Sequence, residues 1–239
     1  MILKCENVTK QFGKLVAVHD VSFEVEEGMI FGIAGPNGSG KTTLFNLITG
    51  IYSYSGDIIF NGEKINGMSP YKICHKGIAR TFQIPQLFLT LSLLENLRAG
   101  AYFGAPKAHH NEMEHINEVL DFVGLKGKES AIAANLKLLD KKLAMIATAL
   151  ATKPKLLLLD EPIAGLNPTE IRQSIELFKR ISQELGLTII IIEHFMKVLT
   201  ELSQRLMILE NGSRICIGAP LEVSKDERVI ETYLGDCYA

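Results

Sequence analysis

Residues Gly35 to Thr42 read G-P-N-G-S-G-K-T, a stretch that fits the phosphate-binding pattern G-x-x-x-x-G-K-[ST] at every fixed position. Residues 29–34, just before it, are apolar enough for a buried strand, and residues 44–48 continue as a helix. This order of strand, loop and helix separates a working phosphate loop from a Gly-rich surface turn, which is the alternative interpretation. The stretch therefore predicts a nucleoside triphosphate site.

The chemistry of such a loop assigns a role to each part of it. Glycines let the backbone wrap closely around phosphate, so that successive N–H groups and the helix N-terminus point at the anion. Lys41 is expected to bring its charge to the β- and γ-phosphates, and the Thr42 hydroxyl to ligate Mg²⁺. The predicted nucleotide-binding residues here are Gly35, Pro36, Asn37, Gly38, Ser39, Gly40, Lys41, Thr42 and Thr43.

A second chemical signal follows the apolar run Leu156–Leu159, which ends on Asp160 and Glu161. Open α/β sheets place their ligand sites at the carboxyl ends of such strands. Asp160 is expected to hold Mg²⁺ through water, and Glu161 to polarise the water that attacks the γ-phosphate. An acidic pair that ends a strand is more often a solvated turn, but the phosphate loop in the same chain favours the catalytic interpretation.

The composition of the 239 residues sets limits on the protein's class. Hydrophobic residues make up 47%, charged residues 22%, and the formal net charge is -2, which is typical of a globular protein and gives no reason to expect nucleic acid as a partner. The cysteines are scattered without a C-x-x-C pair, which favours reduced thiols. The apolar runs at 156–159 and 187–192 are far shorter than the ~20 residues that span a bilayer, so we expect no membrane-spanning segment.

The order of apolar and polar residues predicts three zones. Residues 1–80 contain short strands, predicted at 2–8, 21–26, 29–34 and 57–60. The middle zone is mainly helical, with helices predicted at 93–99, 111–123 and 136–151. From Pro154 strands and helices alternate again, with strands predicted at 156–159, 188–192, 205–209 and 214–217 and a helix at 169–185. Apolar strands that alternate with amphipathic helices predict a parallel sheet covered on both faces.

Further short motifs occur in a fixed order around these two signals: K-Q-F-G at 10–13, R-T-F-Q at 80–83, A-G-L-N at 164–167, and His194 after an apolar strand. In this order, and over nearly all of its length, the chain resembles an ATP-binding subunit of an ABC transporter. The resemblance implies an α/β fold: a P-loop NTPase core of ABC-ATPase type, an N-terminal antiparallel β subdomain, and an inserted α-helical subdomain at 84–151. It also implies one nucleotide-binding domain over 1–239, with ATP and Mg²⁺ as cofactors and ATP hydrolysis coupled to transport.

The resemblance implies roles for three further residues. Phe12 corresponds to the aromatic residue that stacks on adenine, although an ordinary buried Phe is the alternative. Gln83 corresponds to the glutamine that senses Mg²⁺ and the attacking water and couples to the membrane partner. His194 corresponds to the histidine that contacts the γ-phosphate, whereas a histidine that ends a buried strand is usually structural. Glu161, His194 and Gln83 are thus the predicted catalytic residues, and Thr42, Gln83 and Asp160 the predicted metal ligands.

Three segments, at 79–83, 164–168 and 228–235, are similar to the ATPases of branched-chain amino acid importers. This similarity implies integral membrane permease subunits and a second ABC ATPase subunit as partners, the same chain or a different one, at the cytoplasmic face of the membrane. The uncharged stretch 84–94 would then lie beside the groove that receives the permease, although ordinary packing explains its apolar residues equally well. Solute and direction stay open, because transport specificity resides in other chains.

One motif departs from the family. Residues 136–142 read L-K-L-L-D-K-K where relatives carry roughly L-S-G-G-Q, the segment that covers the γ-phosphate of a partner subunit. A Leu139 side chain should obstruct the close backbone approach that glycine permits, and Asp140 places a negative charge where an anion should bind, offset in part by Lys137 and the adjacent lysines. Thr148 also stands where relatives usually carry Arg.

Two hypotheses explain this segment. In the favoured one it is degenerate, so that the chain binds ATP·Mg, hydrolyses it poorly alone and acts in a heterodimer; in the other, the Lys137 charge replaces the lost hydrogen bonds. Two other classes stay open: a soluble P-loop ATPase of DNA repair or translation, and a nucleotide-binding regulator without catalysis. The length of the chain leaves no room for the coiled-coil arms or tandem cassettes of the former, and the presence of Glu161 and His194 argues against the latter.

Overall fold

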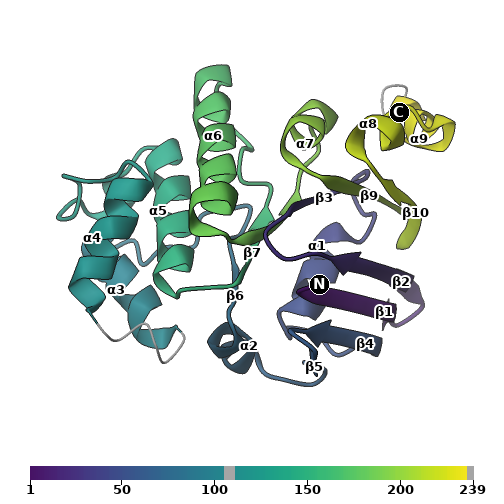
Figure 1. Cartoon of the computed structure of the whole chain (residues 1–239), viewed down its shortest axis with the longest axis horizontal. Coiled ribbons are helices and arrows are strands. Elements are labelled where there is room, and N and C mark those ends of the chain that lie inside the picture. The colour runs from purple at the N-terminus through teal and green to yellow at the C-terminus, as the bar shows by residue number, and fades with distance from the viewer. Residues whose placement is uncertain (105–110, 236–239) are drawn as a thin grey trace. The chain divides into compact units, whose positions relative to one another are not determined.

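The computed structural model describes residues 1–104 and 111–235, which form two compact units (Figure 1). The first unit combines residues 1–70 with the C-terminal part of the chain from Phe178, and the second runs from Tyr71 to Leu177. Two helices, α2 (Pro70–Lys76) and α6 (Pro168–Leu185), include the points where the chain passes from one unit to the other.

The first unit contains two sheets. One has the order β2-β1-β4-β5 and antiparallel pairing; the other contains β10-β9-β3-β8, in which β3 pairs in parallel with both β8 and β9. Its elements are β1 (Leu3–Phe12), β2 (Leu15–Val25), β3 (Ile30–Ala34), α1 (Lys41–Ile48), β4 (Ser55–Phe60), β5 (Glu63–Lys64), β8 (Thr188–Ile192), α7 (Met196–Leu202), β9 (Arg205–Glu210), β10 (Ser213–Gly218), α8 (Pro220–Val223) and α9 (Glu227–Gly235).

The parallel strands form where the sequence is continuously apolar. Every residue of β3 and of β8 is buried, which is the pattern of strands covered on both faces. The register aligns Ile33 with Ile192, so the carboxyl ends of β3 and β8 finish at the same edge of the sheet. The mixed α/β architecture and the antiparallel sheet near the N-terminus confirm the fold class expected from the sequence.

The antiparallel hairpin β1–β2 is longer than predicted, because two bulge residues interrupt its alternation of apolar and polar side chains. Asn7 and Asp20 both have left-handed backbones (φ 50° and 51°), and Asn7 Nδ2 donates to Asp20 Oδ1 at 2.7 Å. The register of the hairpin shifts between Cys5 and Lys10. Because the pattern of period two fails there, the sequence predicts a first strand that ends at residue 8 and a second strand that begins at residue 21.

The second unit contains a short parallel pair of strands and a group of helices. Its elements are β6 (Ile78–Arg80), α3 (Leu93–Phe103), α4 (Glu112–Phe122), the 3₁₀ turn η2 (Ala133–Asn135), α5 (Leu138–Ala151) and β7 (Leu156–Asp160). The register of β6 and β7 pairs Arg80 with Leu158, and β7 is buried throughout. The three long helices lie close to the predicted positions. Seven shorter elements are not predicted, because they carry too few residues to establish a period: β5, β6, α2, η2, α7, α8 and α9.

Helices α3 and α5 approach closely through small residues. A Cβ at Gly100 would lie 2.5 Å from the Thr148 carbonyl oxygen, and a Cβ at Gly104 would lie 2.7 Å from Thr152 Cα. The Thr148 hydroxyl donates to the Ala144 carbonyl of its own helix at 2.9 Å, as Ser and Thr hydroxyls do inside helices. The close approach of the backbones therefore accounts for glycine at positions 100 and 104.

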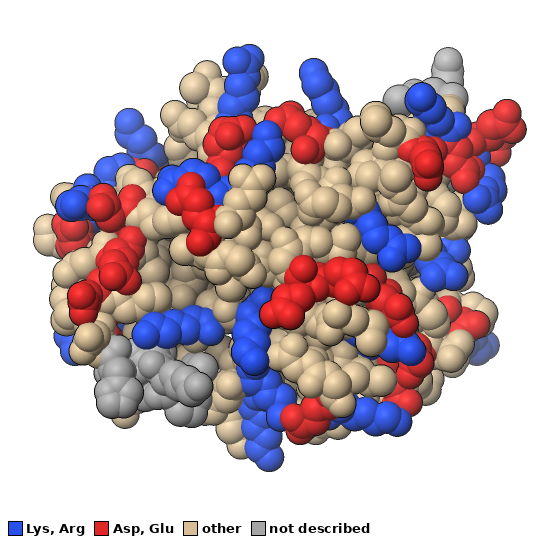
Figure 2. Space-filling view, viewed as in Figure 1, with Lys and Arg blue, Asp and Glu red and all other residues tan. Residues whose placement is uncertain are grey.

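In the described part of the chain, no helix combines the length and apolar character needed to cross a bilayer. The cysteines at positions 5, 74 and 216 are free, and Cys237 lies outside the described residues. Lys and Arg side chains lie among Asp and Glu side chains on the face drawn in Figure 2. Exposed ion pairs such as Lys64–Asp57 contribute little to stability.

Candidate functional site

The phosphate loop connects buried strand β3 to helix α1 and depends on glycine at two positions. A Cβ at Gly35 would lie 2.0 Å from the Leu209 carbonyl oxygen, and a Cβ at Gly40 would lie 2.4 Å from the Ala17 carbonyl oxygen. Both residues have positive φ, at 147° and 101°. Neither space nor backbone conformation therefore allows a side chain at either position.

Lys41 is the buried cation of this loop. Its Nζ donates to the carbonyl oxygens of Gly35 and Pro36, each at 2.8 Å, and reaches Ser39 Oγ at 3.4 Å. Lys41 is 5% exposed, and it stands at the first position of α1, where the helix dipole also favours an anion. The tip of the loop at Asn37 and Gly38 is exposed to solvent, so this cation lies beneath a loop that an anion can reach.

Phe12 lies on the surface and not in the core, which removes the ordinary buried Phe as an interpretation. Its side chain is 40% exposed and meets Tyr52 edge to face, with ring centroids 5.1 Å apart. Lys10 Nζ lies 4.9 Å from the centroid of Phe12 and 5.6 Å from that of Tyr52. The exposed rings can stack on a purine base, and the lysine ammonium can approach the phosphates of the same nucleotide. Sequence reasoning missed Tyr52, which belongs to no recognisable motif, and it gave no role to Lys10, although Lys10 begins the K-Q-F-G motif.

His194 follows β8, one residue after Glu193, whose N–H donates to the Ile33 carbonyl at 3.3 Å. Ile33 is close to the point where β3 enters the phosphate loop, so the paired strands bring His194 to the same sheet edge as that loop. His194 is half-buried. The structure thus places three of the predicted regions, Phe12, residues 35–43 and His194, in the first unit.

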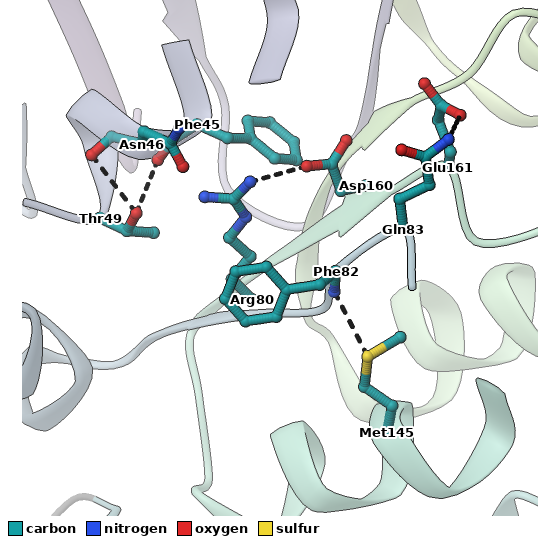
Figure 3. Close-up of polar contacts among 9 residues, drawn as sticks. All are labelled: Phe45, Asn46, Thr49, Arg80, Phe82, Gln83, Met145, Asp160 and Glu161. Atoms are coloured by element: carbon teal, nitrogen blue, oxygen red, sulfur yellow. Dashed lines mark hydrogen bonds and ion pairs between the residues drawn. The ribbon is translucent and has the colours of Figure 1, made fainter. Parts of the chain in front are cut away.

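The acidic pair belongs to the second unit, where it contacts the R-T-F-Q segment (Figure 3). Asp160 ends β7, and its Oδ2 accepts a hydrogen bond from Arg80 Nη2 at 2.7 Å. Glu161 Oε2 accepts a hydrogen bond from Gln83 Nε2, also at 2.7 Å. Two predicted site residues, Gln83 and Glu161, are therefore in direct contact, and Arg80 is an additional charged partner that sequence reasoning did not identify.

Glu161 has an unusual backbone. Its φ is 47°, a left-handed conformation that is uncommon for a residue other than Gly, Asn or Asp. The buried Lys142 donates from Nζ to the Glu161 carbonyl oxygen at 3.2 Å and so supports this peptide. Strained backbone of this kind is found preferentially where a side chain must be aimed at a ligand.

The atypical segment begins helix α5. Lys137 is the N-cap residue and makes no side-chain cap hydrogen bond, so the usual hydroxyl of that position is absent. Asp140 Oδ2 accepts from Lys128 Nζ at 2.7 Å, whereas Lys141 Nζ turns back to the Ala134 carbonyl. The charge of Asp140 is thus offset by Lys128, a partner that the sequence pattern does not predict.

A pocket of about 620 Å³ opens beside this helix start. Leu139 and Lys137 line it together with residues at the start of α6, among them Asn167, whose Oδ1 accepts from the N–H groups of Thr169 and Glu170. Leu139 therefore places an apolar side chain on the wall of this pocket, at a position where a glycine would leave the backbone open.

Leu139→Gly is expected to raise ATP hydrolysis in the assembled complex, because it opens the N-terminus of α5 to a partner's phosphate. The control is Leu185→Gly, which removes an exposed leucine from a different helix, α6, and carries a helix cost of at most about 1 kcal/mol. Steady-state phosphate release measures both rates. Equal rates for both variants and the parent would show that the Leu139 side chain does not limit hydrolysis.

The segment that follows Gln83 exposes apolar side chains. Ile84, Phe88 and Leu89 are exposed, and the buried Asn96 side chain fixes the backbone of Phe88, accepting from its N–H at 2.8 Å and donating to its carbonyl at 3.1 Å. Ordinary packing within the subdomain therefore does not explain these three residues. Exposed apolar side chains that follow one another in a short segment are candidates for contact with a protein partner.

The first unit contains a phosphate loop between a buried strand and a helix. In the second unit, two carboxylates stand at the end of a buried strand. Together these features define the class of P-loop nucleotide-binding proteins. Residues 18–164 match the family model described as ABC transporter. The chain is 34% identical, over 98% of both chains, to the high-affinity branched-chain amino acid transport ATP-binding protein BraF of Pseudomonas aeruginosa. It is 35% identical to a probable branched-chain amino acid transport ATP-binding protein LivG of Archaeoglobus fulgidus, over 98% of this chain and 95% of that one.

A solved structure gives the same assignment. The ADP conformation of MJ1267, an ATP-binding cassette of an ABC transporter, matches with a TM-score of 0.89 and 34% identity over 98% of both chains. The chain belongs to the ABC transporter family, and it is an ATP-binding cassette of that family.

The stacking of the Phe12 ring on adenine can be tested by Phe12→Ala, which is expected to weaken ATP binding roughly fivefold to 150-fold, the usual effect of losing one base–aromatic stack. Phe12→Tyr keeps the ring and should bind within about twofold of the parent. Displacement of a fluorescent nucleotide measures the affinities. Tyr71→Ala, which removes an exposed aromatic residue of the second unit, is the control. An unchanged affinity for Phe12→Ala would rule out stacking on this ring.

Proposed function

We propose that this chain is the ATP-hydrolysing subunit of a membrane importer whose cargo is a branched-chain or similar amino acid. The observation that carries the proposal is full-length similarity to transport ATP-binding proteins of that class, in a chain that keeps Lys41, Asp160, Glu161 and His194. We also propose that the whole of 1–239 acts as one nucleotide-binding domain, with the helical insertion at 84–151.

In this proposal the nucleotide contacts Phe12 and residues 35–43. The oxygen donors Thr42, Asp160 and Gln83 suit Mg²⁺, which prefers hard oxygen ligands. Mg²⁺ would neutralise charge on the β- and γ-phosphates. Glu161 accepts a proton from the attacking water, and His194 contacts the γ-phosphate. The hydrogen bond from Gln83 to Glu161 supports an orienting role for Gln83, because it holds the carboxylate in one direction.

The proposed transporter contains two further kinds of subunit: integral membrane permease subunits, and a second ABC ATPase subunit at the cytoplasmic face of the membrane. The exposed side chains Ile84, Phe88 and Leu89 support docking of a permease next to Gln83. The dimeric structure of the related cassette MJ0796, bound to ADP and Pi, supports pairing of two ATPase subunits; it matches with a TM-score of 0.81 and 25% identity over 92% of this chain and 99% of that one.

The substituted segment favours a heterodimer as the second candidate arrangement. Lys137 lacks a cap hydrogen bond and Leu139 lines the pocket at the start of α5, so this chain is better equipped to bind ATP than to cover the ATP of an identical partner. The purified chain is then expected to bind ATP·Mg and to hydrolyse it slowly.

Co-purification tests the proposal directly. The chain is expressed in the organism from which it comes and is isolated from detergent-solubilised membrane. The proteins that co-purify with it are identified by mass spectrometry. The proposal expects permease subunits and an ATPase subunit among these proteins. It also expects that leucine, isoleucine or valine stimulates ATP hydrolysis by the purified complex. Association with nucleic-acid enzymes, or hydrolysis stimulated by other solutes only, would contradict it.

A further inference from the structure

Arg80 and Asp160 form a buried ion pair at the ends of two adjacent strands. Arg80 ends β6 and Asp160 ends β7, and the distance from Nη2 to Oδ2 is 2.7 Å (Figure 3). The side chains are 5% and 3% exposed. A carboxylate buried to this degree requires a compensating charge, and in this structure the guanidinium supplies it.

The same carboxylate is the proposed metal ligand, and this creates a conflict of charge. A divalent cation at Asp160 would lie within a few ångströms of the guanidinium, and two cations repel strongly in a site from which water is excluded. The guanidinium and the metal therefore cannot both have Asp160 as their main partner. Binding of Mg²⁺ at this carboxylate must weaken the bond to Arg80.

Arg80 is also connected to the surface loop. Its guanidinium carbon lies 4.8 Å from the centroid of the Phe82 ring, and the Phe82 N–H donates to Met145 Sδ at 3.3 Å. Phe82 is 39% exposed and is followed by Gln83 and by the exposed side chains of Ile84 and Phe88. A shift of the guanidinium thus acts on a ring at the start of the apolar surface described above.

We propose that Arg80 is a positioning residue that holds Asp160 before the metal arrives, and that Mg²⁺ displaces it and thereby moves the Phe82 ring. The inference rests on the proposed function in one respect, the assignment of Asp160 as a ligand of Mg²⁺. It adds a second link between the acidic pair and the loop, through charge, beside the hydrogen bond from Gln83 to Glu161.

The sequence contains no tryptophan, so a single introduced tryptophan reports on its own surroundings through its fluorescence. Phe82→Trp places a single indole over the guanidinium, and its emission is recorded while MgCl₂ is added to the full chain in saturating ADP. We expect a saturable change in emission. The change should be absent in Phe82→Trp combined with Arg80→Met, and present in the combination with Arg80→Lys, which keeps the charge. Phe88→Trp, on the same loop, is the control for general effects of Mg²⁺.

A second measurement follows the metal itself. Arg80→Met is expected to lower the melting temperature of the nucleotide-free chain by roughly 6 °C or more, because it removes the guanidinium from the buried Asp160 carboxylate. It should also lower the Mg²⁺ concentration needed for half-maximal stabilisation in ADP at least tenfold, because the guanidinium no longer competes with Mg²⁺ for the Asp160 carboxylate. Arg98→Met, which breaks the exposed pair with Glu112, should change neither quantity appreciably.

The outcomes separate this inference from the proposed metal site. If Asp160→Asn abolishes the Mg²⁺ dependence while Arg80→Met leaves the Mg²⁺ midpoint unchanged or raises it, Arg80 does not compete with the metal and the inference is wrong. The inference is equally wrong if the indole at position 82 responds to Mg²⁺ to the same extent with Arg80 and with Met at position 80. If Asp160→Asn leaves the Mg²⁺ dependence intact, the assignment of Asp160 as a metal ligand fails, and with it the premise of this inference.

Discussion

Glu161→Gln is expected to lower the rate of ATP hydrolysis by the assembled transporter roughly 10²–10⁴-fold, the usual contribution of a general base. The amide preserves the size of the side chain, and its oxygen can still accept the hydrogen bond from Gln83. The left-handed backbone is supported by Lys142 through the carbonyl oxygen, so the substitution leaves that contact intact. Affinity for ATP should therefore stay within about threefold of the parent, since the lost group acts on water and not on the nucleotide.

Phosphate release and displacement of a fluorescent nucleotide separate the two effects. Glu118→Gln, which changes an exposed carboxylate of α4, is the matched control and should retain the parent rate. A loss of activity below about fivefold in Glu161→Gln would assign the base to another group. A large loss of ATP affinity would instead indicate that Glu161 serves the fold of the site.

The second large effect is expected from Lys41→Met, which should weaken ATP binding roughly 10-fold to 150-fold, the value of one charged hydrogen bond to phosphate. Methionine has a similar length but donates no hydrogen bond. The ammonium makes two bonds of 2.8 Å to loop carbonyls, so the substitution also removes internal support from the loop.

Calorimetric titration with ATP measures the affinity, and a melting curve without nucleotide shows whether the loop has lost its structure. Lys126→Met, at an exposed lysine paired with Asp121, is the control and should bind ATP like the parent. ATP affinity within about twofold of the parent in a folded Lys41→Met chain would show that the lysine charge does not hold the phosphates.

The parts of the site that could be predicted from the sequence are those whose function depends on a short, contiguous stretch. The phosphate loop is one, because two glycines, a lysine and a threonine must follow a strand at fixed spacing. The pair Asp160–Glu161 is another, because an uninterrupted run of leucines between turn signals favours a buried strand that ends there. In both cases one local segment contains the whole chemical requirement.

The parts that could not be predicted depend on side chains brought together from distant positions. Lys128 neutralises Asp140, Tyr52 completes the aromatic surface of Phe12, and Arg80 pairs with Asp160. None of these residues belongs to a pattern with a fixed spacing to its partner. The hairpin β1–β2 was predicted too short for a related reason, since the bulge that bends it is stabilised by a contact between Asn7 and Asp20 across the strands.

By itself, therefore, the sequence indicated the family through resemblance and predicted the fold class from strand hydrophobicity. It also predicted the nucleotide-binding residues from local spacing. Only the tertiary structure decided which charges meet. It exposed Phe12, gave Asp140 a partner from another loop and put a guanidinium on the carboxylate of Asp160. The physical reason is that burial and pairing of charges depend on distances through space, which neither composition nor the order of residues along the chain specifies.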